Sequence, residues 1–169
     1  MIKILLIASL FLLPLNSCDD KGTNIQKEEM NKNTVINFVS SIWNEKDLSQ
    51  LDQFFSQEFK RRVNNVEIAS TKEELTANIQ VYLTGFPDLN LLIDDILPYH
   101  DQVIMNWTIT GTNTGVFGEF PATGKKIKVS GLSHLSFDEN GKISYEDIFY
   151  NELSLLQQLG YSLTPPALN

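Results

Sequence analysis

The spacing of apolar residues changes halfway along the chain, and this change limits the folds open to it. Residues 33–47 carry apolar side chains at intervals of three and four residues, the period of one helix face. A short helix is predicted over residues 47–55. Thr71 and Glu74 form a capping box that starts a third helix, which ends near Tyr82. The first half of the chain is therefore predicted to be helical.

The second half of the chain contains four β-rich runs. Most of their connections are short and polar, and Asn140-Gly141 is a hairpin signal. A closing helix is predicted from Glu152, ending at Gly160. The four runs span residues 88–99, 102–112, 125–137 and 141–150. Helices followed by strands connected in sequence predict an α+β fold in which helices pack on an antiparallel sheet.

Residues 1–17 have the pattern of a signal peptide. Lys3 precedes an apolar run from Ile4 to Leu15, which is shorter than the ~20 apolar residues that span a bilayer. The run is followed by "NSC", ending at Cys18, the only cysteine of the chain. "LNSC" resembles the lipobox of bacterial lipoproteins, whose cysteine is acylated. We therefore expect a protein of the bacterial cell envelope that faces the periplasm or exterior, held by acyl chains on Cys18. The alternative is a soluble secreted protein.

The remaining residues divide into three predicted parts. Residues 18–29 are polar and suit a tether, residues 30–162 are long enough for one domain, and residues 163–169 form a tail. The chain carries 13 basic and 21 acidic side chains. An acidic surface repels phosphates and anionic headgroups, so we expect no nucleic-acid partner and a membrane contact made by lipid alone.

Several segments between about Phe86 and Gly160 resemble the SnoaL-like polyketide cyclase family, a branch of the nuclear transport factor 2-like superfamily. In order, and at matching separations, they are "FPDL", "WTITGTNTGVFGEFPATGK", "VSG", "GKI" and "LLQQLG". The resemblance implies a cone in which helices cover one face of a curved sheet and leave a pocket between them. Enzymes, binding modules and transport factors share this fold, so the resemblance alone does not decide the function.

The resemblance also indicates where catalytic groups would lie. The family's cyclases use an aspartate in the strand after the Gly-Lys-Ile turn and a histidine in the strand before it. In this chain those positions hold Ile148 and Leu135, neither of which can exchange a proton. Asp147 and His134 are each one residue away, and a one-residue offset in a strand turns a side chain to the opposite face. The family's reaction by the family's route is therefore not expected.

Glu146 is the carboxylate of this region that is predicted to reach the pocket, because it shares a strand face with Ile148 and Tyr150. A poorly solvated carboxylate suits general acid/base chemistry. The alternative is that Glu146 lies at the rim or makes a structural hydrogen bond. Asp147 and Glu152 are expected on a solvated strand face and at the start of a helix.

An apolar pocket is the functional feature that the sequence favours most. Its predicted ligand-binding residues are Tyr82, Phe86, Met105, Trp107, Leu135, Ile148 and Tyr150. Core packing explains most residues of this kind, but an apolar hollow with a few polar groups is also a default ligand site. We expect a lipid-anchored domain that binds a small apolar molecule and lacks cyclase activity.

Two other functions stay open. One is an isomerase, cyclase or hydrolase that uses Glu146 with help from Tyr150 or Tyr82. The other is an interaction module that forms homodimers through the outer face of its sheet. No cofactor or metal is predicted, since the two histidines lie far apart and there is no second cysteine. The basic residues Lys60, Arg61 and Arg62 are expected on a solvated face.

Overall fold

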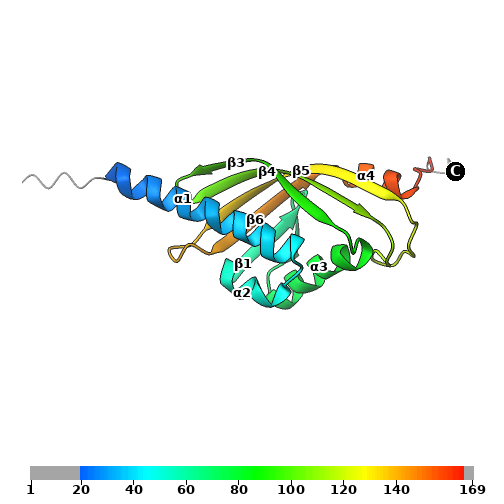
Figure 1. Cartoon of the computed structure of the whole chain (residues 1–169), viewed down its shortest axis with the longest axis horizontal. Helices are drawn as coiled ribbons and strands as arrows, with labels where there is room; N and C mark the ends of the chain where they lie inside the picture. Colours follow the sequence, from blue (N-terminus) through cyan, green and yellow to red (C-terminus); the bar gives the residue numbers. More distant parts are fainter. Residues whose placement is uncertain (1–19, 166–169) are drawn as a thin grey trace, which may run out of the picture.

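The helices of the protein lie against a strongly curved sheet, as Figure 1 shows for the computed structural model, which describes residues 20–165. The sheet has six strands in the order β2-β1-β6-β5-β4-β3. All neighbouring strands are antiparallel except β1 and β6, which are parallel. The strands are β1 Phe55–Val63, β2 Val66–Ala69, β3 Asn90–Tyr99, β4 Gln102–Thr112, β5 Lys126–Phe137 and β6 Ile143–Tyr150. The predicted α+β class is confirmed.

The helical segments begin and end close to where the sequence signals place them, apart from the first. They are α1 Asp20–Phe38, a π-helical continuation Val39–Asn44, a 3-10 turn Leu48–Gln50, α2 Leu51–Phe54, α3 Lys72–Gly85 and α4 Glu152–Leu159. The Thr71 hydroxyl accepts from the Glu74 backbone, which completes the predicted capping box of α3. Gly160 closes α4 in the left-handed region at φ 103°, where glycine carries no side-chain strain.

Helix α1 starts ten residues earlier than the predicted domain, because Asp20–Phe38 is one continuous helix. The segment expected to be a tether is therefore helical from residue 20 onward. A helix satisfies its own backbone, so it does not need an apolar stripe along its whole length. Glu28, within the segment expected to be a tether, contacts the sheet, because its carboxylate accepts from the His100 backbone N–H at 2.8 Å. Whether the domain boundary lies at Met30 stays a prediction.

The predicted signal peptide and Cys18 lie outside the described residues. Within residues 20–165, no helix is both long and apolar enough to cross a membrane.

The strands β1 and β2 were not predicted from the sequence. They form a hairpin whose turn residues Asn64 and Asn65 both have positive φ, at 48° and 69°, a conformation that asparagine tolerates well. The inward face of β1 carries Arg61 at a buried position, which interrupts the apolar alternation that marks a strand. The sequence interpretation named no strand between the second and the third helix, and the parallel pairing of β1 with β6 is the one departure from the expected antiparallel arrangement among the described strands.

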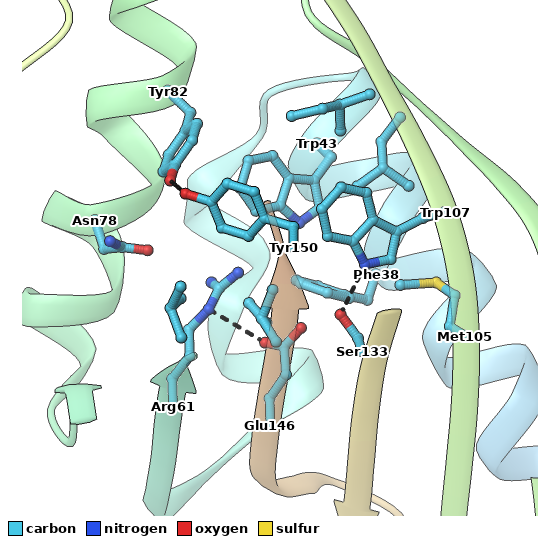
Figure 2. A pocket seen from close by; sticks show the side chains of 14 residues that line it. Phe38, Trp43, Arg61, Asn78, Tyr82, Met105, Trp107, Ser133, Glu146 and Tyr150 are labelled. Atoms are coloured by element: carbon cyan, nitrogen blue, oxygen red, sulfur yellow. Dashed lines mark hydrogen bonds and ion pairs between the residues drawn. The ribbon is translucent and has the colours of Figure 1, made fainter. Parts of the chain in front are cut away.

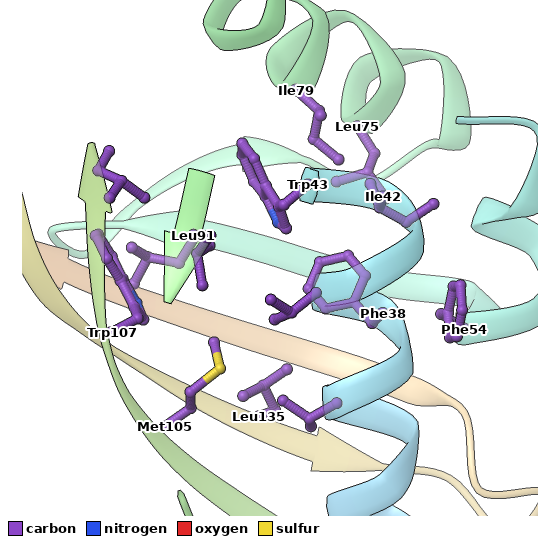
Figure 3. Packing of buried hydrophobic residues seen from close by; sticks show 14 of the residues in the cluster. Phe38, Ile42, Trp43, Phe54, Leu75, Ile79, Leu91, Met105, Trp107 and Leu135 are labelled. Atoms are coloured by element: carbon purple, nitrogen blue, oxygen red, sulfur yellow. The ribbon is translucent and has the colours of Figure 1, made fainter. Parts of the chain in front are cut away.

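The core fills the space between the helices and the concave face of the sheet. Figure 3 shows Phe38 at the end of α1, Ile42 in the π-helical continuation, and Leu75 and Ile79 from α3, turned toward this space. The sheet contributes buried side chains that include Met105, Trp107 and Leu135.

A glycine in β5 makes room for the largest of these side chains. Gly131 is paired with Trp107 across β4 and β5, and a Cβ atom at residue 131 would lie 2.4 Å from the indole ring. Only glycine therefore lets the Trp107 ring lie over the neighbouring strand. This contact explains the "VSG" segment in physical terms and fixes one wall of the pocket described below.

Candidate ligand pocket

A largely apolar pocket lies between the helices and the inner face of the sheet (Figure 2). Its volume is about 50 Å³, which is room for only a few water-sized groups. Helix α1, its π-helical continuation, helix α3 and strands β1, β3, β4, β5 and β6 contribute side chains to it. The lining residues are Phe38, Trp43, Arg61, Val63, Asn78, Tyr82, Leu91, Met105, Trp107, Ile109, Ser133, Glu146, Ile148 and Tyr150.

The two tryptophans of the chain both line this pocket. The indole N–H of Trp107 donates to the Ser133 hydroxyl at 3.1 Å, and both residues are buried. The polar edge of Trp107 is thereby satisfied inside the protein, so its ring can offer an apolar surface to the cavity.

Arg61 and Glu146 form an ion pair inside the protein. The Arg61 Nε and Glu146 Oε2 atoms are 3.3 Å apart, and the two side chains are only 3% and 2% exposed. Their Cα atoms are register partners across the parallel pair of β1 and β6, so the pairing of the strands places the charges together. The Arg61 guanidinium also lies 5.6 Å from the centre of the Trp43 ring, within range of a cation–π interaction.

The hydrogen bonding of this ion pair is incomplete. The Nη1 atom of Arg61 is buried and has no hydrogen-bond partner within the described part of the chain. The contact between Nε and Oε2 does not meet hydrogen-bond geometry either. Buried polar groups in proteins are normally satisfied, so this guanidinium, on a residue that lines the pocket, retains a hydrogen bond that the described residues do not make.

Tyr82 and Tyr150 join helix α3 to strand β6 above the pocket. Their hydroxyl oxygens are 2.8 Å apart (Figure 2). The Tyr82 ring packs edge to face against Trp43 and Phe117, with ring centres 6.1 and 5.3 Å away. Burial raises the pKa of both phenols above the usual value, and the neighbouring Tyr82 adds to the rise at Tyr150. Both side chains are therefore neutral hydrogen-bonding groups at physiological pH.

Five of the seven predicted ligand-binding residues line the pocket: Tyr82, Met105, Trp107, Ile148 and Tyr150. The other two do not. Phe86 is fully buried and packs against Phe117 at a ring-centre distance of 5.2 Å, and Leu135 is fully buried in the core. Phe86 was expected to help close the mouth of the pocket and Leu135 to line it, but both are buried in the core and neither is among the lining residues. Whether a ligand contacts any of these residues stays a prediction.

The predicted register of β5 and β6 is confirmed. Leu135 and Ile148 are buried at 0% and 7% exposure, and Glu146 is buried beside them. Asp147 lies on the other face, where it pairs with Arg62 at 3.4 Å and accepts from the Tyr145 hydroxyl. His134 is half-buried, and its Nε2 atom is 3.2 Å from the Gln102 side chain. Neither His134 nor Asp147 lines the pocket.

Arg61 is the charged residue among the pocket residues that the sequence interpretation did not predict, which also include Trp43, Asn78 and Ser133. It was expected on a solvated face with Lys60 and Arg62, and for Arg61 this is wrong, because the side chain is 3% exposed. A signal was present in the sequence. Phe59, Arg61 and Val63 alternate toward one face just before the two asparagines of a tight turn, which is the pattern of a strand in a hairpin.

The remaining candidates are placed as follows. His100 is exposed in the turn between β3 and β4, and Glu152 lies in the first turn of α4. Among residues 20–165, no three or more side chains of His, Cys, Asp or Glu come close enough together to hold a metal ion.

The sequence profile of the SnoaL-like polyketide cyclase family matches residues 33–159. No curated protein matches the chain. Among solved structures, AclR from Streptomyces galilaeus, a candidate hydroxylase, is 26% identical over 82% of this chain and 86% of its own, with a TM-score of 0.72. A candidate SnoaL-like polyketide cyclase from Jannaschia is 20% identical over 82% of this chain and 95% of its own, also with a TM-score of 0.72.

A phenazine biosynthesis-related protein from Pseudomonas aeruginosa shares the fold at lower identity. It is 15% identical over 88% of this chain and 96% of its own, with a TM-score of 0.70. The arrangement of helices on a curved sheet is thus the nuclear transport factor 2-like cone.

The buried ion pair predicts a strong energetic coupling between Arg61 and Glu146. Arg61→Met or Glu146→Leu alone leaves a buried charge without its partner, which should lower the free energy of unfolding by about 3–5 kcal/mol. The double variant removes both charges and should recover most of that loss. Urea denaturation of the four proteins measures the coupling.

The outer ion pair of Arg62 and Asp147 is the matched control, since the same strands carry it on the opposite face. Its side chains are 32% and 16% exposed, so the same substitutions there should show coupling of about 1 kcal/mol or less. Equal coupling for the two pairs would contradict the structural role of the inner one.

The raised pKa of Tyr82 and Tyr150 predicts a loss of stability at alkaline pH. In the unfolded chain a tyrosine loses its proton near pH ~10, while these two keep theirs to higher pH in the folded protein. The folded form then binds more protons, so the free energy of unfolding falls as the pH rises past about 10. In urea denaturation at a series of pH values, Tyr150→Phe should flatten this decline. Tyr99→Phe, at a ring that is 68% exposed, should leave it unchanged, and equal slopes in the two variants would refute the assignment.

Proposed function

Because the chain belongs to the SnoaL-like polyketide cyclase family, we propose that it binds a small, largely apolar molecule in its pocket and does not carry out cyclase chemistry. The single observation that carries this proposal is the pocket itself. It is walled mainly by aromatic and aliphatic side chains and holds a few polar groups at fixed positions. Apolar walls with a small number of oriented polar groups are the usual composition of small-molecule sites.

The absence of cyclase chemistry is supported by the side chains at the family's two proton-transfer positions. Ile148 lines the pocket and Leu135 lies buried behind it, and neither can take or give a proton. Loss of a general acid or base ordinarily costs on the order of 10²- to 10⁴-fold in rate. A chain that lacks both groups would have to use another route.

An enzyme that uses Glu146 is the second candidate. The observation in its favour is that Glu146 is the only carboxylate among the residues that line the pocket. Against it stands the ion pair with Arg61, which already gives this carboxylate a structural role. If turnover of any substrate were found and Glu146→Gln abolished it without unfolding the protein, the enzyme would replace the binder.

A homodimer through the outer sheet face is a third proposal and is compatible with either function. Its support is the group of apolar side chains that this face leaves accessible. Leu92, Ile104 and Phe149 are 58%, 40% and 39% exposed. Sedimentation of Ile104→Asp against the unchanged chain tests it, since a charge at the interface should dissociate a dimer.

Filling the cavity tests the binding function directly. We expect the full-length protein, purified from its native host, to release a small molecule on organic extraction that mass spectrometry detects. Met105→Trp should abolish this species, because the larger ring occupies the cavity. The matched control is Ile104→Trp, one residue away on the opposite face of β4, which should retain it.

Two results would bear against the binding function. Recovery of the same species from both tryptophan variants would mean that it binds elsewhere. If no species is recovered from the unchanged chain, and no small apolar probe binds in solution, the binding function is wrong. Thermal denaturation of both variants establishes that they fold.

We also propose that the protein is anchored to a membrane of the bacterial envelope through acyl chains on Cys18. The support is the basic, apolar and "LNSC" succession of the N-terminal residues. Cys18→Ala should move the protein from the membrane pellet to the soluble fraction after cell lysis. A lipid-modified Cys18→Ala protein that stays in the pellet would contradict the anchor.

A further inference from the structure

The unpartnered guanidinium of Arg61 is the most unusual polar group in the described structure. Its side chain is 3% exposed and lines the pocket, and its Nη1 atom is buried without a hydrogen-bond partner among the described residues. Figure 2 shows the guanidinium pointing into the space below Tyr150, between Asn78 and Glu146. A buried N–H donor that makes no hydrogen bond costs free energy, and an acceptor placed beside it would remove that cost.

The charge balance around Arg61 decides which acceptors suit it. Glu146 already supplies one negative charge at 3.3 Å, so the pair is neutral as a unit. A ligand carboxylate would bring a second negative charge close to the Glu146 carboxylate in a poorly solvated site, where like charges repel strongly. A neutral acceptor adds a hydrogen bond to Nη1 without that repulsion.

The walls of the pocket restrict the rest of the ligand. Trp43 and Trp107 present aromatic surfaces, and Met105, Ile109 and Ile148 present aliphatic ones. The cavity of about 50 Å³ admits only a compact group. The ligand's buried end must therefore be small and apolar apart from one acceptor.

We propose that the pocket recognises uncharged molecules by a carbonyl oxygen that accepts a hydrogen bond from Arg61 Nη1, and that Glu146 excludes carboxylates from the same position. This inference rests on the proposed binding function and names the chemical class of its ligand. Arg61 is the residue that sets the specificity, and Glu146 is the residue that sets the charge of the ligand.

Two pairs of probes of matched shape test the inference on the full-length chain. Cyclopentanone and methylenecyclopentane differ only in a carbonyl oxygen replaced by a CH₂ group. Cyclopentanecarboxamide and cyclopentanecarboxylate differ in charge at nearly equal volume. The indole N–H signals of Trp43 and Trp107, the only two tryptophans of the chain, report occupancy in ¹H–¹⁵N NMR titrations.

We expect the ketone to bind on the order of tenfold to a hundredfold more tightly than the alkene, the range for a hydrogen bond to a charged donor. The amide should bind at least about tenfold more tightly than the carboxylate. Equal binding of ketone and alkene would overturn the role of Arg61, while leaving the proposed binding function intact. Tighter binding of the carboxylate than of the amide would overturn the role of Glu146. If none of the four probes perturbs either indole signal, the binding function itself fails.

Substitutions test whether the preference for the ketone over the alkene depends on Arg61. The double variant Arg61→Met with Glu146→Leu keeps the site neutral and should bind ketone and alkene equally. The matched control is Arg62→Met, which makes the same change at the next residue of β1 on the opposite face, where Arg62 pairs with Asp147. It should retain the full preference for the ketone. Loss of the preference in Arg62→Met, or its persistence in the double variant, would refute the assignment to Arg61.

Discussion

The ion pair between Arg61 and Glu146 is the interaction on which the pocket end of the molecule depends. Two charged side chains, 3% and 2% exposed, lose nearly all contact with water, and their mutual attraction and the Trp43 ring offset part of that loss. This balance holds only while β1 lies parallel to β6 in the observed register, because that register brings the two Cα atoms side by side. A slip by one residue would expose one charge and leave the other buried alone. The pair therefore specifies how the β1–β2 hairpin joins the sheet.

Aromatic side chains form much of the rest of the pocket wall. Gly131 gives the Trp107 ring its place over β5, and Ser133 satisfies the indole N–H, so a large flat surface faces the cavity without an unpaired donor. Tyr82 and Tyr150 then bridge helix and sheet through their hydroxyl groups at 2.8 Å. Entry of a molecule much larger than the cavity would require these rings to move apart. The small size of the cavity is thus a consequence of aromatic packing.

Each inner strand of the sheet has two faces with separate tasks. On β6, Glu146, Ile148 and Tyr150 point to the pocket, while Asp147 pairs with Arg62 on the outside. The contrast between Arg61 and Arg62 is instructive, because the two neighbouring residues have the same chemistry and opposite surroundings. Arg62 and the Tyr145 hydroxyl both contact the Asp147 carboxylate near solvent, and Arg62 also donates to that hydroxyl. Arg61, on the pocket side, has buried N–H groups without a hydrogen-bond partner among the described residues.

The sequence by itself determined the features that depend on neighbours within a few residues. The capping box at Thr71, the helix end at Gly160 and the alternation along β4, β5 and β6 are local, so they predicted the α3 and α4 helices and the inward direction of Leu135, Glu146 and Ile148. Only the tertiary structure decided where Arg61 points. An arginine is expected to be exposed to solvent unless a buried partner is known, and the partner here, Glu146, lies far along the chain. It also decided that Phe86 and Leu135 lie outside the cavity lining. The shape of a cavity is the space left by side chains from many segments at once, and no single segment encodes it.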